Sequence, residues 1–151
     1  MHSRNFVLHF ESGLPRATAQ QKGEAIRYKN GRPYIQHYKK DNVTALRTEL
    51  KYKLARYAPP VPTDKPVRLF VWVCFDVKDR KAWGHYKTTR PDADNYVKEL
   101  KDVMTEVGFW LDDAQVVDLR VVKTYAEKGS ISIQVDTLGE ISKLRGPKHD
   151  G

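Results

Sequence analysis

One segment, Val67 to Val77, limits most strongly how this 151-residue chain can fold. Apolar residues occupy both alternating sets of its positions, with Val71 in one set and Trp72 in the other. A strand that is apolar on both faces is typical of the middle of a sheet, where its neighbours cover it. The segment therefore predicts a central strand.

The amino-terminal part of the chain predicts a strand and a hairpin. Phe6 to Phe10 is a short apolar run, which is typical of a strand. Ala25 to Tyr28 and Pro33 to Gln36 flank an Asn30-Gly31 pair. Such a pair favours a type I′ turn, because that turn needs positive φ at both central residues, and so these segments predict a β-hairpin.

Two further segments predict helices. In the first, apolar residues recur at helical spacing until a Pro59-Pro60 pair ends the helix, and they are Val43, Leu46, Leu50, Leu54 and Tyr57. The second segment, Asn95 to Val107, is amphipathic. Gly108 follows it, and a glycine readily adopts the left-handed conformation that ends many helices.

The remaining pattern predicts two strands and a loop. Residues 115–124 and 130–135 alternate between apolar and polar side chains, and Glu127-Lys128-Gly129 predicts a hairpin that joins them. Residues 78–90 are rich in Lys and Arg without a clean period, which predicts a mobile loop. We expect one domain over residues 1–138 and a disordered polar tail over residues 139–151.

Composition argues against several classes of protein. The chain has no apolar stretch long enough to span a bilayer, and no signal peptide follows Met1. A single cysteine, Cys74, cannot form an intramolecular disulfide. The five histidines lack the spacing of a zinc site. These features predict a cytoplasmic protein without a membrane partner.

The formal net charge of +8 is unevenly distributed. Residues 1–60 hold 12 Lys and Arg against 4 Asp and Glu, whereas residues 61–151 hold 15 of each kind. The whole excess therefore lies in the first sixty residues. Clustered positive charge is typical of nucleic-acid binding, although charge alone is equally compatible with simple solubility.

Carboxylates gather at the two ends of the second predicted helix. Asp92 and Asp94 precede it, with Asp94 placed as its N-cap, and Lys98 follows one turn later. Asp112 and Asp113 follow the glycine at its other end. Acids within a basic protein indicate a divalent-metal site that acts on a polyanion, because the ion needs anionic oxygens while the surroundings attract phosphate. The combination indicates a nuclease.

Whether the two acidic pairs meet is open at this stage. A helix of this length is about 20 Å long, so its two ends are not automatically neighbours. Trp110 and Leu111 could pack beside the sheet and return the chain, or the second pair could come from another subunit. The acids also have a simpler interpretation, since Asp-x-Asp before a helix is typical of capping and turns.

The same residues carry a resemblance to a known family. The chain contains Asp92-x-Asp94-Asn95-x-x-Lys98, then Gly108-Phe109-Trp110-Leu111-Asp112-Asp113-Ala114-Gln115-Val116-Val117-Asp118, then Arg120-Val121-Val122-Lys123. In order and spacing, this pattern resembles the signature of the RusA family of Holliday junction resolvases. The clear match runs from Pro91 to Val135, with a looser one from Val67.

The resemblance implies a fold and a chemistry. The fold would be α+β (mixed α/β), a small mixed sheet with two main helices packed on it, in a homodimer. Asp92, Asp94 and Asp113 would bind Mg²⁺, with Mn²⁺ as the alternative ion, and Lys98 would assist at the phosphate. Asp112 is a weaker candidate, because the family's ligand falls on the second aspartate. Each subunit would nick one strand of a four-way junction in DNA recombination and repair.

Basic residues near these elements are candidates for contacts with the DNA backbone. They are Arg47 and Lys51 on the first helix and Lys81, Lys87 and Arg90 in the loop. Trp83 or Tyr86 could stack on unpaired bases, or serve as a local plug or dimer contact. Two other functions stay open: a non-catalytic basic module that binds branched DNA, and an RNA-associated protein without preference for junctions.

Overall fold

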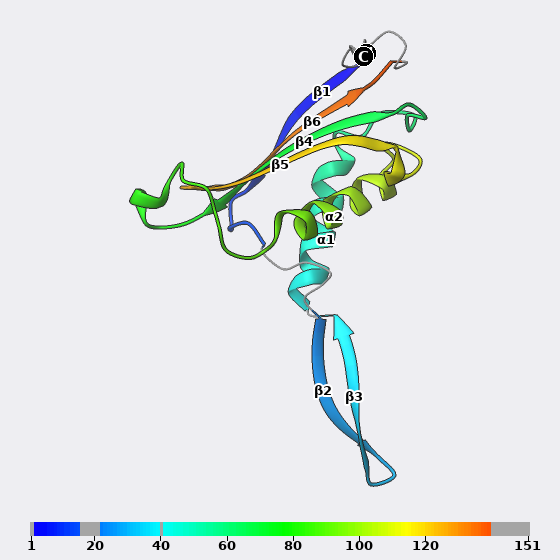
Figure 1. Ribbon diagram of the computed structural model, residues 1–151, viewed down its shortest axis with the longest axis vertical. Coiled ribbons are helices and arrows are strands. Elements are labelled where there is room, and N and C mark those ends of the chain that lie inside the picture. The colour runs from blue at the N-terminus through cyan, green and yellow to red at the C-terminus, as the bar shows by residue number, and fades with distance from the viewer. Residues whose placement is uncertain (1, 16–21, 40, 140–151) are drawn as a thin grey trace, which may run out of the picture.

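The computed structural model describes residues 2–15, 22–39 and 41–139, and of residues 22–27, 35–39 and 41–44 it describes the backbone (Figure 1). The strands are β1 (Ser3–Phe10), β2 (Lys22–Lys29), β3 (Arg32–Lys39), β4 (Val67–Asp76), β5 (Val116–Ala126) and β6 (Gly129–Thr137). The helices are α1 (Asp41–Ala55) and α2 (Ala93–Glu106), with single 3-10 turns η1 (Arg80–Ala82) and η2 (Asp113–Gln115). The predicted α+β class is confirmed. The predicted tail, apart from Gly139, lies outside the described residues.

Four strands form one mixed sheet in the order β1-β6-β4-β5. β6 pairs antiparallel with β1 and with β4, whereas β4 and β5 run parallel. A parallel pair needs a crossover connection between its strands, and α2 lies in that connection. The central strand predicted over residues 67–77 is confirmed, because β4 lies between β6 and β5.

The predicted hairpin between the last two strands is wrong. Residues 127 and 128 do link β5 to β6, but the two strands do not pair with each other, because β4 lies between them. Phe70 of β4 is opposite Arg120 of β5 on one side and Gln134 of β6 on the other. The strongly apolar β4 takes the inner position, and the link passes its end.

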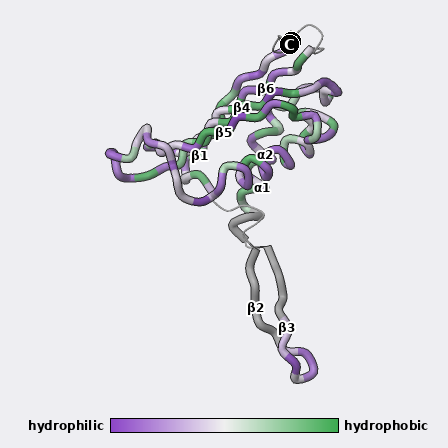
Figure 2. The backbone as a smooth tube through the Cα atoms, in the orientation of Figure 1, coloured by the Kyte–Doolittle hydropathy of each residue, from purple (hydrophilic) through white to green (hydrophobic). Residues whose placement is uncertain are grey.

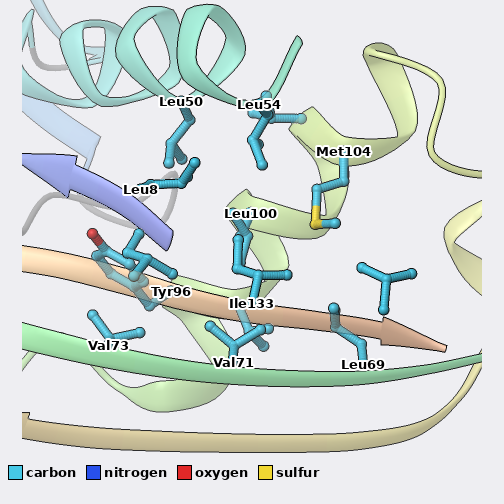
Figure 3. Close-up of a cluster of buried hydrophobic side chains, with 14 of the residues drawn as sticks. Leu8, Leu50, Leu54, Leu69, Val71, Val73, Tyr96, Leu100, Met104 and Ile133 are labelled. Atoms are coloured by element: carbon cyan, nitrogen blue, oxygen red, sulfur yellow. The ribbon is translucent and has the colours of Figure 1, made fainter. Parts of the chain in front are cut away.

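Both helices pack on one face of this sheet and enclose the core with it (Figure 3). Leu50 and Leu54 of α1 and Leu100 of α2 are fully buried there, with Leu69 and Val71 from β4. The apolar periods of both helices therefore face one common core, as the sequence predicts. Within the described residues, neither helix is long and apolar enough to cross a membrane.

The opposite face of β4 is only partly covered. Trp72 is 44% exposed there, and its indole N–H donates to the Thr124 hydroxyl at 2.8 Å. The guanidinium of Arg120 lies 5.0 Å from the centre of the Phe70 ring. Side chains of the neighbouring strand thus shield part of the second apolar face of β4.

α2 ends where the sequence predicts, just before Gly108. Gly108 has a φ of +91°. The N–H groups of Gly108 and Phe109 donate to the carbonyls of Thr105 (3.1 Å) and Met104 (3.0 Å), which is the Schellman pattern. Phe109 and Trp110 then enter the core, with 2% and 1% of their surface exposed.

β2 and β3 form a separate antiparallel ribbon that projects away from the sheet and helices (Figure 1). The predicted turn is confirmed, since Asn30 and Gly31 have φ values of +53° and +74°. The tip of the ribbon is hydrophilic (Figure 2). The four-stranded sheet with its two helices and the β2–β3 ribbon are thus distinct parts of one chain.

We expect Gly108→Ala to lower the free energy of unfolding by about 1 to 2 kcal/mol, because an L side chain is strained at this positive φ. Gly108→Asn should lose less, since asparagine tolerates the left-handed conformation better. Urea unfolding measures both. Gly139→Ala is the control, because open space surrounds that position and its φ is not positive. Equal stabilities of the Gly108→Ala and Gly139→Ala variants would contradict the assigned role.

Candidate metal and nucleic-acid site

The amino-terminal end of α2 presents two carboxylates and a lysine to solvent. Asp92 is the N-cap residue and makes no side-chain capping bond, Asp94 lies in the first turn, and Lys98 lies one turn further on. All three side chains are exposed. The predicted N-cap role of Asp94 is wrong, because the Tyr96 N–H donates to the Asp92 carbonyl (3.0 Å) and the helix begins two residues earlier.

Lys123 of β5 holds the segment that leads into this end of α2. Its Nζ donates to the carbonyl oxygens of Thr89 (2.9 Å) and Pro91 (2.7 Å). These bonds fix the backbone directly before Asp92. The sequence places Lys123 within the family-like signature but gives it no role, because no local pattern marks a lysine that bonds the backbone of a distant segment.

Residues 78–90 form a loop, as the sequence predicts, and hydrogen bonds tie this loop to the sheet. η1 opens the segment, and its later part bonds the outer edge of β5. The Lys87 N–H donates to the Lys123 carbonyl (2.9 Å), and the Tyr125 N–H donates to the His85 carbonyl (3.0 Å). The edge of β5 thus orders a segment whose sequence has no period of its own.

The side chains of this segment differ in exposure. The Trp83 indole donates to the Val77 carbonyl at 2.8 Å, so Trp83 is a local plug, whereas Tyr86 is 75% exposed. Lys87, predicted as a DNA contact, is 8% exposed, and its ammonium lies 5.1 Å from the centre of the Tyr125 ring. The exposed cations of the segment include Lys81 and Arg90.

Arg47, also predicted as a DNA contact, is engaged inside the protein. Its guanidinium donates to Glu99 Oε1 at 2.9 Å and to Glu106, and so joins α1 to α2. Glu99 is 1% exposed. Burial lowers the pKa of Arg47, but the bond to Glu99 and the charges of Glu99, Glu106 and Asp102 outweigh it and raise that pKa. Arg47 is therefore engaged within the protein, whereas Lys51 is 63% exposed and stays a predicted DNA contact.

Asp112 and Asp113 lie beyond the opposite end of α2. The Asp112 carboxylate caps η2 and forms a capping box with Gln115. Asp113 is half-buried and lines an open hollow of about 440 Å³ together with Asp102 and Glu106. Asp112 lines the same hollow, but its carboxylate also caps the turn, so Asp113 is the one of the pair without a capping role.

One chain does not bring the predicted ligands together. α2 has 14 residues and is therefore about 21 Å long at 1.5 Å per residue, with Asp92 and Asp94 at its start and Asp113 beyond its end. Leu111 is 65% exposed, and the chain continues through η2 directly into β5 instead of returning along α2. In the described ranges, no three His, Cys, Asp or Glu side chains group closely enough to hold a metal. Fold and site define a small α+β domain that offers two carboxylates at the start of its crossover helix.

Comparison with known proteins gives the family. Residues 14–136 match the family model described as endodeoxyribonuclease RusA. A Lactococcus phage r1t protein named crossover junction endodeoxyribonuclease rusA is 35% identical over 132 residues, which cover 86% of this chain and 96% of the phage protein. Proteins named crossover junction endodeoxyribonuclease RusA from Escherichia coli K12 and Shigella sonnei are 45% and 60% identical over 65 residues, 43% of this chain and 54% of each relative. The chain belongs to the RusA family.

We expect Arg47→Ala to lower the free energy of unfolding by about 3 kcal/mol, because it leaves the buried Glu99 carboxylate without its partner. Lys51→Ala is the matched control on the same helix. Its ammonium lies 3.8 Å from Glu106 and is exposed, so its loss should change stability by less than about 1 kcal/mol. Urea unfolding compares the two. A stable Arg47→Ala protein with weakened DNA binding would instead return Arg47 to the DNA surface.

Proposed function

We propose that this protein is a structure-selective endodeoxyribonuclease that resolves Holliday junctions by paired metal-dependent nicks in DNA recombination and repair. The observation that carries the proposal is the family match over residues 14–136, joined to the exposed Asp92 and Asp94 at the start of α2. The names of the relatives describe crossover junctions as their substrate. The net charge of +8 supports a polyanionic ligand. A cytoplasmic location stays a prediction.

Mg²⁺ is the cofactor that we propose, with Mn²⁺ as the alternative ion. Asp92 and Asp94 fit such an ion, since both are exposed and neither carboxylate has a hydrogen-bond or ion-pair partner among the described residues. Mg²⁺ keeps several waters and is commonly held by one or two carboxylates. When bound, the ion would make a water nucleophilic at neutral pH and stabilise the leaving oxygen.

The other groups at this end of α2 would act on the phosphate itself. In hydrolysis the water oxygen bonds to phosphorus and the bond to the 3′ oxygen breaks, so negative charge develops on the phosphoryl oxygens and on the leaving oxygen. Lys98 would neutralise that charge, and the open N–H groups of the first helical turn would add positive potential. Lys123 would keep Asp92 in place through the backbone it holds.

We expect Asp94→Asn to slow cleavage of a synthetic four-way junction about a thousandfold or more, since an ion that stabilises the transition state contributes several kcal/mol. Binding should stay equal or tighten, because the variant removes a negative charge from a phosphate site. Gel assays of labelled junctions with Mg²⁺ and with EDTA measure both properties. Asp64→Asn, at an exposed acid outside the site, is the control. A wild-type cleavage rate for Asp94→Asn would overturn the assignment of Asp94 as a metal ligand. If the unmodified protein binds junctions tightly but cuts none, the protein is a non-catalytic binding module.

We further propose a homodimer in which Asp113 of the partner subunit completes each site. Asp113 is surrounded in sequence by exposed apolar side chains at the edge strand β5, with Leu111 at 65%, Val117 at 64% and Leu119 at 42% exposure. The bonds from residues 84–87 reach only the later part of β5, and exposed apolar side chains beside the earlier part of this edge strand favour contact with another copy. A two-fold dimer would also place its two sites on opposed strands of a four-way junction, which has matching symmetry.

Mixing two inactive variants tests whether the site is shared. In a mixed dimer of Asp94→Asn and Asp113→Asn chains, a shared arrangement gives one site with both substitutions and one site with none. We therefore expect the mixture to regain nicking of one strand per junction, although each variant alone is inactive. The control is a mixture of Asp92→Asn and Asp94→Asn chains, whose two substitutions lie at the same end of α2, so it should regain nothing. No recovery in the first mixture would show that each site lies within one chain.

A further inference from the structure

The described segment that precedes the β2–β3 ribbon contacts the same end of α2 that carries Asp92 and Asp94. The hydroxyl of Tyr96, in the first turn of α2, donates to the carbonyl of Pro15 at 2.9 Å. Pro15 is the last described residue before β2. Each strand of the ribbon has 8 residues and therefore extends about 26 Å at 3.3 Å per residue. The ribbon thus reaches well beyond the start of α2, where Asp92 and Asp94 lie (Figure 1).

The tip of the ribbon is basic and aromatic. Lys29 and Arg32 are exposed, and Tyr28 and Tyr34 are 73% and 46% exposed. The register places Lys29 directly opposite Arg32, and opposed residues of an antiparallel pair share a face. Like charges in that position repel each other. None of the described residues forms an ion pair with either cation, so the pair favours an anionic ligand from outside the chain.

The charge of the whole ribbon agrees with that of its tip. Residues 22–39 contain one acid, Glu24, against five basic residues, which are Lys22, Arg27, Lys29, Arg32 and Lys39. The resulting charge of +4 is half of the net charge of the chain. A two-stranded ribbon also has a suitable width for DNA, since the major groove admits one. Charge and shape together favour duplex DNA over an apolar or cationic partner.

We propose that the β2–β3 ribbon is an arm that grips a duplex segment of the DNA away from the bond that is cut. Lys29 and Arg32 bind its phosphates, and Tyr28 and Tyr34 pack against its sugars and groove walls. The proposal rests on the proposed function in taking branched DNA as the ligand. Phosphate contacts of this kind give affinity without sequence preference, because each one releases counterions from the DNA. The arm therefore holds a duplex segment of the substrate while the residues at the start of α2 act at the branch point.

The test compares Lys29→Ala/Arg32→Ala with the unmodified protein on two synthetic four-way junctions in EDTA. One junction has arms of about 20 base pairs, and the other has capped arms of about 6 base pairs, shorter than the ribbon because 26 Å corresponds to about 8 base pairs. On long arms we expect about tenfold weaker binding by the variant and a log–log salt slope shallower by about two, near 0.9 for each lost phosphate contact. On short arms the two proteins should bind equally.

Matched controls make each outcome decisive. Lys65→Ala/Lys128→Ala removes two exposed lysines outside the ribbon and should keep the wild-type affinity and salt slope. Equal binding of the ribbon variant and the unmodified protein on long arms overturns the proposal, and so does an equal loss on both junctions, which would place the tip at the branch. A changed mass in light scattering with an unchanged salt slope also overturns it, since the ribbon would then contact a second copy. If the unmodified protein cuts no junction with Mg²⁺ or Mn²⁺, the proposed function fails, yet binding in EDTA still decides the role of the arm.

Discussion

The parallel pairing of β4 with β5 determines where the acidic residues of this protein can lie. Parallel neighbours require the chain to cross from one end of the sheet to the other between them, and α2 makes this crossing. The residues that precede α2, which include Asp92, therefore lie near the carboxyl end of β4. The residues that follow α2, which include Asp113, lie near the start of β5. Asp94 and Asp113 are separated by topology, and no repacking of side chains within one chain would join them. A site with all three carboxylates is therefore not assembled within the described part of one chain.

The ion pair between Arg47 and Glu99 limits which basic side chains are available to bind DNA. A carboxylate buried to 1% exposure is costly unless a cation accompanies it, so Arg47 is committed to the contact between α1 and α2. Lys87 is likewise drawn inward, over the ring of Tyr125. Positive charge in the sequence is thus not the same as positive charge available to DNA. The cations that stay exposed include Arg90 and Lys98 near the start of α2 and Lys29 and Arg32 at the tip of the ribbon.

Local patterns predicted local structure well, and failed where the partner is distant in sequence. Helical spacing predicted α1 and α2, and Asn30-Gly31 predicted its turn, because these signals act within a few residues. The pairing of β5 was mispredicted, since turn residues do not specify which strand lies between two others. The order of residues 78–90 comes from the edge of β5, and the burial of Glu99 comes from another helix. The family-like signature predicted the candidate acids, but the sequence could not decide whether they meet within one chain.

The separation of charge along the chain has a physical consequence for a metal site. The positive excess lies in residues 1–60, which contain β1, the ribbon and α1, whereas residues 61–151 are balanced and carry the candidate ligands. A lysine packed directly against Asp92 would form an ion pair and compete with a divalent ion for the same oxygens. The ribbon avoids this competition at its tip, because the opposed Lys29 and Arg32 lie at its far end, away from the start of α2 (Figure 1). Attraction of the polyanion and binding of the ion can therefore coexist in one small domain.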